Sequence, residues 1–579
     1  MKLRPVNAMV LDLWKECLNN NTIPLLIYSA PTGYGKTELI PYLFKSAYEG
    51  YYVARLIHAS PSRSLVERIF NKKYRGRLLG LFKSMGLSEE DITYQAMSLF
   101  ALESKDAYFA GRVVVTTIDS LFMNQFKLCV PEIIKTMSHY EEPRSFIATS
   151  MIAYDEAHLY GGDPGVSEFT SLLYFYASLL SAVNKLRPIA VISATLPEKT
   201  LDYMTSRVEQ SRFYKEGKLR ILKVNYGEEP YIDKDFDELV ENMRWHINLV
   251  SSKGLKKVVK ELLNMGYKLL IVRNTPEAAV LTYTMLSSIL PKDVTLIHGR
   301  FTLKDRDKLS KNLEEQKVVI ATQVIEVGLD LDADVLISDP IPLSQLIQRS
   351  GRVCRDLVTR KNRENKLYAY IYILEDGVRE PYENMLIERT MNLIKEGSVK
   401  DLNLRKHSVC SDLLRKVYGE ESLKYLDKHI NEVTSLIGID SSPKISKLKV
   451  KDMLIERIIP LIRGSLILPV YVGEEDKPSD TKSIINNSVP VSLSWIKKHL
   501  DTLSIIGGRV EAYFAGFEVK QGEESIVLDS INLEELLSVD AERLILTLIF
   551  DKGLIALKGR RDKYNPIYGL VKMNIKGGQ

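Results

Sequence analysis

The sequence has few cysteines, no long apolar segment and no periodic glycine or proline pattern. Its 579 residues include four cysteines and no Cys-x-x-Cys pair, which excludes a zinc ribbon or a disulfide framework. The longest uncharged, apolar-rich stretch, Phe169 to Asn184, is too short to cross a bilayer. The 32 glycines and 22 prolines show no repeat, which excludes a fibrous chain. These absences favour a soluble cytoplasmic protein.

The chain also lacks a strong charge of one sign. Lys and Arg number 79 against 74 Asp and Glu, so any nucleic-acid site must be a local patch rather than a general basic field. Hydrophobic residues make up 45% and charged residues 26%, which excludes wholesale disorder. At about 150 residues per domain, the length predicts three or four domains. Charges at Asp12, Lys15 and Glu16 argue against a signal peptide.

Short apolar runs alternate with longer amphipathic segments over the first 200 residues. This alternation predicts a parallel sheet with helices on both faces. Residues 201–265 break the rhythm, and we expect a hairpin or a connecting region there. Alternation resumes at Lys268 in a second α/β unit of similar size. The strands expected in the first unit are 23–30, 52–59, 112–117, 146–154 and 188–193.

The expected fold class is therefore α/β, with two tandem parallel-sheet domains and a C-terminal accessory domain. We place the first domain, with its connecting region, at residues 1–245 and the second at 246–395. The accessory domain is placed at 396–579, where the pattern is first helical and then mixed. One strand-like segment is expected there, at 510–519.

A phosphate-binding loop is predicted at residues 29–37, which read Ser-Ala-Pro-Thr-Gly-Tyr-Gly-Lys-Thr between an expected strand and an expected helix. Gly33 and Gly35 let backbone N–H groups face phosphate oxygens, and the helix N-terminus adds a positive dipole. Lys36 is expected to meet the β- and γ-phosphates, and the Thr37 hydroxyl to bind Mg²⁺. The alternative is an accidental glycine-rich turn. The loop residues expected to bind nucleotide are Ala30, Thr32, Gly33, Gly35, Lys36 and Thr37.

Two adjacent carboxylates end an apolar strand at residues 151–158, Met-Ile-Ala-Tyr-Asp-Glu-Ala-His. Beside a phosphate loop, Asp155 is expected to hold Mg²⁺ through water, and Glu156 to orient and deprotonate the attacking water. Adjacent positions point to opposite faces of a strand, as the two roles require. Without the loop, a solvated turn would be the more common interpretation. His158 is either a packed polar residue or a contact between the nucleotide and the second domain.

In this order, the motifs resemble motifs I and II of superfamily 2 helicases. The resemblance continues with Ser193-Ala-Thr195 as motif III, 321–330 as motif V and 348–355 as motif VI. Three further segments, 61–65, 113–121 and 296–306, resemble more narrowly the CRISPR-associated helicase of type I interference systems. The resemblance extends from about residue 23 to residue 375 and implies two RecA-like domains that bind ATP and Mg²⁺.

The resemblance also implies a catalytic role for individual residues. Arg352 and Arg355 would be arginine fingers that reach the γ-phosphate from the second domain, and Gln348 would help to sense the nucleotide. An arginine finger on a mobile domain makes hydrolysis conditional on closure, because a loose phosphoryl transition state needs added positive charge. Arg349 is expected to brace the domain interface. The implied catalytic residues are Lys36, Asp155, Glu156, Gln348, Arg352 and Arg355.

Further residues are assigned to nucleotide binding, coupling and nucleic-acid contact. Gly328 and Asp330 would contact the nucleotide or its ribose, and Ser193 and Thr195 would couple hydrolysis to movement. Single strands are expected along loops that carry basic and hydroxyl side chains. The expected nucleic-acid contacts are Arg63, Thr116, Thr117, Asn274 and Arg300. For any basic cluster, a merely solvated surface is the alternative.

Two features depart from the resembled families. Asn7 stands where many superfamily 2 helicases carry an adenine-reading Gln, which puts base specificity in doubt. None of the eight histidines is followed by Asp, although full-length CRISPR helicases carry a nuclease domain built on a His-Asp pair. The phosphate loop also begins near residue 29. We therefore expect a split form, with the nuclease on a separate polypeptide.

The leading hypothesis is an ATP-dependent translocase on single-stranded DNA, moving 3′ to 5′, that unwinds target DNA for a CRISPR surveillance complex. Its partners would be that complex and a separate nuclease. One alternative is an RNA helicase with the same ATPase site, since strand choice depends on a few sugar contacts. Another is an ATP-gated scaffold with little turnover, against which Lys36, Glu156 and Arg355 argue.

Overall fold

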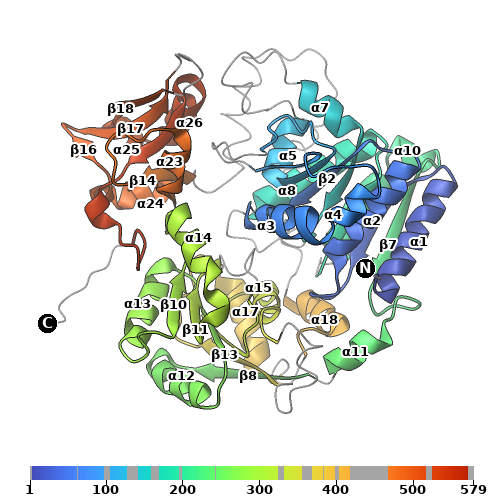
Figure 1. Ribbon diagram of the computed structural model, residues 1–579. Coiled ribbons are helices and arrows are strands. Elements are labelled where there is room, and N and C mark those ends of the chain that lie inside the picture. The colour runs from blue at the N-terminus through green and yellow to red at the C-terminus, as the bar shows by residue number, and fades with distance from the viewer. Residues whose placement is uncertain are drawn as a thin grey trace.

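The chain forms three units, each built on one β-sheet (Figure 1). The structure is a computed structural model, and it describes residues 3–61, 63–96, 105–126, 141–157, 168–194, 198–241, 243–323, 331–354, 368–382, 384–397, 403–417, 467–516 and 525–571. In Figure 1 the first unit is blue to teal, the second green to yellow and the third orange to red. In the parts of the chain that the structure describes, no helix is long and apolar enough to span a membrane.

The first unit has a seven-stranded parallel sheet in the order β3-β4-β2-β5-β6-β1-β7. Strands β1, β4, β5 and β6 are buried along their whole length, as expected where helices cover both faces. The strands are β1 (Ile23–Ser29), β2 (Arg55–Ser60), β3 (Ile92–Gln95), β4 (Val113–Thr117), β5 (Ser150–Tyr154), β6 (Ile189–Ser193) and β7 (Leu219–Asn225). The helices are α1 (Pro5–Asn19), α2 (Lys36–Glu49), α3 (Arg63–Arg68), η1 (Ile69–Arg77), α4 (Leu79–Lys83), α5 (Ile118–Gln125), α7 (Glu141–Ala148), α8 (Glu168–Asn184), α9 (Glu198–Glu209), α10 (Arg212–Lys215) and α11 (Lys234–Glu241).

The second unit has a six-stranded parallel sheet in the order β10-β11-β9-β12-β13-β8. The strands are β8 (Arg244–Val250), β9 (Leu269–Val272), β10 (Val294–Ile297), β11 (Val318–Ala321), β12 (Val335–Ser338) and β13 (Tyr368–Leu374). The helices are α12 (Leu255–Asn264), α13 (Pro276–Ser287), α14 (Leu303–Lys311), α15 (Leu343–Ser350), α17 (Asn384–Lys395) and α18 (His407–Val417), with short 3₁₀ turns η3 (Ser252–Gly254) and η4 (Leu313–Glu315). The expected α/β class with two parallel-sheet domains is therefore confirmed.

The third unit is a mixed sheet in the order β15-β14-β19-β17-β16, with β18 paired to β17. The expected strand at 510–519 is present as β17 over its described part. The strands are β14 (Ile467–Tyr471), β15 (Ser488–Ser492), β16 (Ile505–Ile506), β17 (Arg509–Ala515), β18 (Ile526–Asn532) and β19 (Leu554–Lys558). The helices are α23 (Thr481–Asn486), α24 (Leu493–Lys498), α25 (Leu533–Leu537) and α26 (Ala541–Lys552), with 3₁₀ turns η7 (Leu500–Thr502) and η8 (Arg561–Lys563).

Three sequence-based predictions need correction. The strand expected at 146–154 begins only at Ser150, because α7 with its acidic first turn occupies the preceding residues. Of the two expectations for residues 201–265, the hairpin is wrong, because β7 pairs in parallel with β1 at the edge of the first sheet. The segment that contains α11, between β7 and β8, connects the first sheet to the second. As an edge strand, β7 mixes buried, half-buried and exposed residues instead of forming an apolar run. The boundary placed after residue 245 falls inside β8, which pairs with β13 in the second sheet.

Candidate nucleotide site

The phosphate loop joins β1 to α2 at the carboxyl edge of the first sheet. Gly33 and Gly35 have φ angles of +81° and +88°, a backbone region that side-chain-bearing residues rarely adopt. The Lys36 ammonium lies inside the loop and donates to the carbonyl oxygens of Ala30 at 2.6 Å and Pro31 at 2.9 Å. Burial lowers the pKa of Lys36, and the nearby carboxylates of Glu156 and Asp155 oppose that shift. The loop therefore holds the Lys36 ammonium on its own carbonyl oxygens.

The two predicted magnesium ligands lie in direct contact. The Thr37 hydroxyl donates to Oδ2 of Asp155 at 2.9 Å, and Asp155 follows the buried strand β5. Burial alone would raise the pKa of Asp155. Hydrogen bonds and charge from His58, the charge of Lys73 and the bond from Thr37 instead lower it to about 2. A hydroxyl beside an ionised carboxylate provides the oxygen ligands that Mg²⁺ prefers, so these residues fit the metal.

Glu156 adopts a strained backbone conformation beside this pair. Its φ angle is +51°, in the left-handed region that is uncommon for residues other than glycine. Its N–H donates to Oδ1 of Asp155 at 2.9 Å. Such strain persists where surrounding contacts over-determine it and is concentrated at functional sites. Asp155 is buried at this turn, and Glu156 is half-buried.

His58 and Tyr74 belong to this site although sequence reasoning did not single them out. His58 lies on β2, which pairs with β5, and its Nε2 is 3.2 Å from Oδ2 of Asp155. Its Nδ1 is 2.6 Å from the Tyr74 hydroxyl. Both side chains are fully buried. The available signal was a histidine inside an otherwise apolar strand, next to the strand that ends in the carboxylates.

Asn7 and Ser193 contact the phosphate loop from two sides. The Asn7 amide donates to the carbonyl oxygen of Gly35 at 3.2 Å and accepts from the Tyr28 hydroxyl at 2.7 Å. Asn7 therefore helps to fix the loop, while its expected relation to the base stays untested. The carbonyl oxygen of Ser193 accepts from the Ala30 N–H at 3.1 Å, which connects motif III to the start of the loop.

The second domain meets the phosphate loop at the end of α15. A Cβ placed on Gly351 would lie 3.3 Å from Oγ1 of Thr32. Gln348 and Arg352, both half-buried, flank this turn. The predicted motif VI is thus adjacent to the loop. Five predicted residues lie outside the described residues: His158, Thr195, Gly328, Asp330 and Arg355.

A second contact between the loop and the second domain comes from α18. Nε2 of His407, the first residue of this helix, lies 3.4 Å from Oγ of Ser29. Burial, together with the charge of Lys36, lowers the pKa of His407 to about 4. This residue was expected to belong to the accessory domain, and no motif in the sequence marked it.

Arg349 braces the second domain internally. It is fully buried and donates to Oδ1 of Asn274 at 3.2 Å, to Ser338 Oγ at 2.8 Å and to the Tyr382 hydroxyl at 3.3 Å. The role expected from the sequence, bracing of the domain interface, is therefore corrected: these partners of Arg349 all lie within the second domain. Its partners are strand ends and a tyrosine from the segment before α17.

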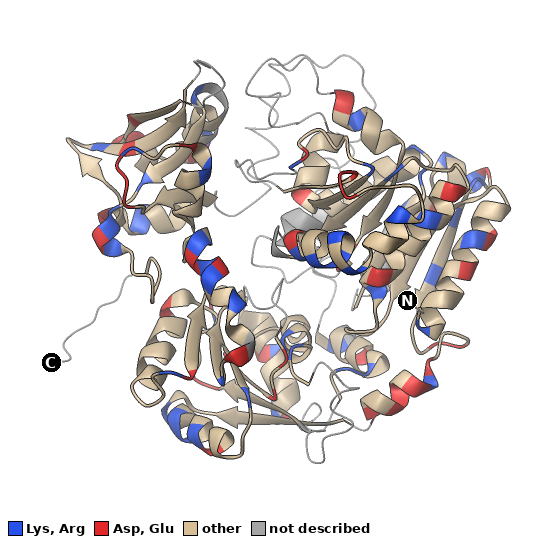
Figure 2. Cartoon of the chain, viewed as in Figure 1, with Lys and Arg blue, Asp and Glu red and all other residues tan. Residues whose placement is uncertain are grey.

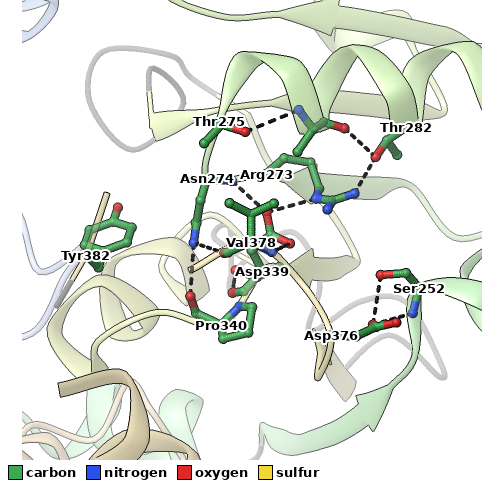
Figure 3. A network of polar contacts seen from close by, with 12 residues as sticks. Ser252, Arg273, Asn274, Thr275, Thr282, Asp339, Pro340, Asp376, Val378 and Tyr382 are labelled. Atoms are coloured by element: carbon green, nitrogen blue, oxygen red, sulfur yellow. Dashed lines mark hydrogen bonds and ion pairs between the residues drawn. The ribbon is translucent and has the colours of Figure 1, made fainter. Parts of the chain in front are cut away.

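Asn274 lies in a buried network where its side chain is fully engaged (Figure 3). Its amide nitrogen donates to the carbonyl oxygens of Pro340 at 3.0 Å and Val378 at 2.6 Å. Its backbone N–H and the Arg273 guanidinium both donate to Oδ2 of Asp339. This position does not favour the predicted nucleic-acid contact, because no amide hydrogen of Asn274 is left for a phosphate. The polar residues at the strand end face inward.

The other predicted nucleic-acid contacts differ in exposure. Thr116 and Thr117 are buried at the end of β4, and the Thr117 hydroxyl donates to Ser120. Arg63 begins α3, and its side chain lies outside the described residues. Arg300 pairs with Glu277 and lies 4.7 Å from the ring centroid of Trp495, in the third unit. These predictions stay untested, and burial disfavours the two threonines in this conformation.

Two family models match separate parts of the chain. The model for DEAD/DEAH box helicases matches residues 14–203, and the model for the C-terminal part of CRISPR-associated nuclease/helicase Cas3 matches residues 265–357. A CRISPR-associated nuclease/helicase Cas3 of Streptococcus thermophilus is 27% identical over 54% of this chain and 35% of its own length. A putative one of Methanocaldococcus jannaschii is 25% identical over 77% of this chain and 61% of its own length. The chain therefore spans between a third and two thirds of these relatives.

Solved structures share the fold. The crystal structure of T. fusca Cas3 has a TM-score of 0.59 at 18% identity and covers 87% of this chain and 65% of its own. The same protein with AMPPNP has a TM-score of 0.60 at 18% identity, covering 85% of this chain and 64% of its own. These likenesses establish a common architecture. In sequence and in fold, the chain is therefore similar to superfamily 2 helicases of the Cas3 type.

Proposed function

We propose that this chain is an ATP-driven translocase that moves 3′ to 5′ along single-stranded DNA and unwinds target DNA in type I CRISPR interference. One observation carries the proposal. The Thr37–Asp155 pair lies in the first domain, and the Thr32 position of the same loop meets Gly351 of the second. A site formed by two domains can convert hydrolysis into relative movement. Relatives named CRISPR-associated nuclease/helicase support the choice of process.

The residues at hand suggest how ATP would be hydrolysed. Lys36 would exchange its carbonyl partners for phosphate oxygens, and Glu156 would orient and deprotonate the attacking water. Thr37 and Asp155 would hold Mg²⁺, which supplies positive charge to the transferred phosphoryl group. Arg352, next to Gly351, would add charge from the second domain on closure, and Arg355 is proposed for the same role.

The partners follow from the same proposal. We propose that the chain acts with a CRISPR surveillance complex and with a nuclease supplied by a separate polypeptide. A structure described as a CRISPR RNA-guided surveillance complex before nicking contains a chain with this fold, with a TM-score of 0.51 at 17% identity over 87% of this chain and 65% of its own. Residues Gly328, Asp330 and Thr195 are proposed for nucleotide contact and coupling. Arg63, Thr116, Thr117 and Arg300 are proposed to lie along the strand.

Strand separation tests this function. Duplex DNA with a 3′ single-stranded tail, the same duplex with a 5′ tail, and matched RNA duplexes are incubated with the chain, ATP and Mg²⁺. The proposal expects ATP-dependent separation of the 3′-tailed DNA, with the Glu156→Gln variant as the inactive control. Equal or faster separation of RNA would indicate an RNA helicase. Hydrolysis-independent binding without any separation would indicate a scaffold.

A further inference from the structure

A buried chain of hydrogen bonds connects the metal-ligand candidate Asp155 to a helical segment on the other side of β2. The His58 ring lies between Oδ2 of Asp155, at 3.2 Å, and the hydroxyl of Tyr74, at 2.6 Å. His58 and Tyr74 are both 0% exposed, so solvent cannot take the place of either partner. The ring can change its position only if the elements that carry its partners move.

The carboxylate sets the direction of the first hydrogen bond in this chain. An ionised carboxylate only accepts, so Nε2–H of His58 donates to Asp155. Nδ1 of the same ring shares a hydrogen bond with the Tyr74 hydroxyl, and burial raises the pKa of Tyr74. A side chain that is hydrogen-bonded to a metal-ligating carboxylate orients that carboxylate and contributes to metal affinity.

Tyr74 belongs to η1, whose backbone is unusual. Residues Ile69–Arg77 form a π-helix, and Gly76 interrupts it with a φ of −101° and a ψ of −106°. Such helices are rare and occur frequently at functional sites. The segment 63–77, which comprises α3 and η1, begins with Arg63, a predicted nucleic-acid contact, and is rich in Lys and Arg (Figure 2). Lys72 and Arg77 are exposed on it.

A second connection joins η1 to the phosphate loop. Nζ of Lys73 lies 3.2 Å from Oε1 of Glu38, and the Arg77 guanidinium lies 3.6 Å from the same oxygen. Glu38 directly follows Thr37, the other candidate magnesium ligand. The single helical segment η1 is therefore connected to both members of the Thr37–Asp155 pair, through Tyr74 and His58 on one side and through Glu38 on the other.

We propose that His58 and Tyr74 are positioning residues that couple the segment 63–77 to Asp155. A nucleic-acid strand bound along this segment would shift η1, and the shift would reach the carboxylate through the phenol and the imidazole. The inference rests on the proposed function, because it assumes that nucleic acid stimulates ATP hydrolysis. It adds a route by which the strand acts on the metal ligand within the first domain.

Conservative variants separate the two hydrogen bonds. Tyr74→Phe removes one hydroxyl and keeps the ring that packs against Phe82. His58→Gln can keep a donor near Nε2 for Asp155 while it loses the hydrogen-bond partner of the Tyr74 hydroxyl. The matched control is Tyr52→Phe, which removes a hydroxyl hydrogen-bonded to Leu18 in the same domain but away from the site. Thermal unfolding of each full-length variant establishes that it is folded.

The first measurement is the stimulation factor, the rate of ATP hydrolysis with saturating single-stranded DNA divided by the rate without it. The proposal expects this factor to fall at least about fivefold in Tyr74→Phe and His58→Gln but not in Tyr52→Phe. A purely structural loss would lower both rates together and leave the factor at the wild-type value. A wild-type factor in Tyr74→Phe therefore overturns the coupling role.

The second measurement does not need nucleic acid. Mn²⁺ is titrated onto each variant in the presence of AMPPNP, and free Mn²⁺ is followed by electron paramagnetic resonance. Loss of the imidazole in His58→Ala should weaken Mn²⁺ binding about tenfold, as expected when a metal ligand loses its hydrogen-bond partner. His58→Gln should keep most of the wild-type Mn²⁺ affinity. Unchanged affinity in His58→Ala overturns the positioning role. If neither DNA nor RNA raises the rate of ATP hydrolysis by the wild-type chain, the proposed function is overturned, and the coupling role with it. In that case the Mn²⁺ affinities still decide whether His58 positions Asp155.

Discussion

Gly351 of the second domain lies against Thr32 of the phosphate loop, so closely that a Cβ on the glycine would be 3.3 Å from the threonine Oγ1. The contact joins the two parallel-sheet domains at the place where nucleotide phosphates are expected. Any side chain at position 351 must therefore displace the Thr32 side chain or the end of α15. The backbone of Gly351 is right-handed helical, so the restriction comes from the neighbouring residues and not from its own φ angle.

Substitution of Gly351 should reduce hydrolysis without abolishing nucleotide binding. We expect Gly351→Ala to lower kcat by less than about threefold. A shift of the Thr32 side chain by a few tenths of an ångström is enough to make room for the added methyl group. Gly351→Val should cost about tenfold or more, because its two methyl groups hold the domains apart. Gly80→Val is the control, since nothing lies within 4 Å of a Cβ at that position. Equal kcat values for Gly351→Val and Gly80→Val would contradict a shared site.

Removal of the Arg349 guanidinium should destabilise the second domain. In Arg349→Met the buried oxygens of Asn274 and Ser338 lose their donor, which is expected to cost about 2–4 kcal/mol of unfolding free energy. Urea unfolding measures the change. The control is Arg220→Met, whose partner Glu16 lies at 3.7 Å on the surface, where the expected change is below about 1 kcal/mol. Similar midpoints for the two variants would show that the buried network contributes little.

Acid should destabilise the contact between the second and third units through His298. Its Nδ1 accepts from the Arg300 N–H at 3.2 Å, and its Nε2 lies 3.1 Å from the carbonyl oxygen of Tyr568. Burial, assisted by the charge of Arg300, lowers the pKa of His298 to about 3 from the ordinary 6.5. The unfolded chain thus binds a proton at a higher pH than the folded chain. The free energy of unfolding must therefore fall as the pH decreases from 6.5 towards 3.

The size of this pH effect follows from the shifted pKa of one group, because each pKa unit corresponds to about 1.4 kcal/mol of unfolding free energy. The stability advantage of the wild type over His298→Gln should shrink by about 2 kcal/mol between pH 7 and pH 5. His407, whose pKa is also lowered, contributes equally to both proteins and cancels in this difference. Urea unfolding at the two pH values measures it. A difference that stays constant with pH would mean that His298 titrates normally in the folded chain.

The sequence predicted those parts of the site that depend on local rules. Gly33 and Gly35 are needed because the loop turns through positive φ angles, and Asp155 could be placed because a buried strand ends just before it. His58 and Tyr74 could not be predicted in this way. The contact of His58 with Asp155 arises from the order of β2 and β5 in the sheet, and strand order leaves no periodic trace in the sequence.

Polar residues at strand ends show the limit of the same reasoning. Asn274 and Ser193 both end or follow a strand in a predicted motif. Ser193 adjoins the phosphate loop, but Asn274 points into a buried network around Asp339. Which way such a side chain points depends on the connection that follows it, here the Pro340 and Val378 segments. Edge strand β7 was missed because its exposed residues, Arg220 and Lys223, interrupt the apolar run that marks a buried strand.

The most direct test of a DNA-driven ATPase site is the steady-state rate of ATP hydrolysis by the full chain with and without single-stranded DNA or RNA of equal length. Glu156→Gln serves as the blank, because it keeps the shape of the side chain and removes the base. The account predicts strong stimulation by DNA, weaker stimulation by RNA, and loss of both in the blank. Hydrolysis that DNA leaves unchanged, or that persists at the wild-type rate in Glu156→Gln, would contradict it.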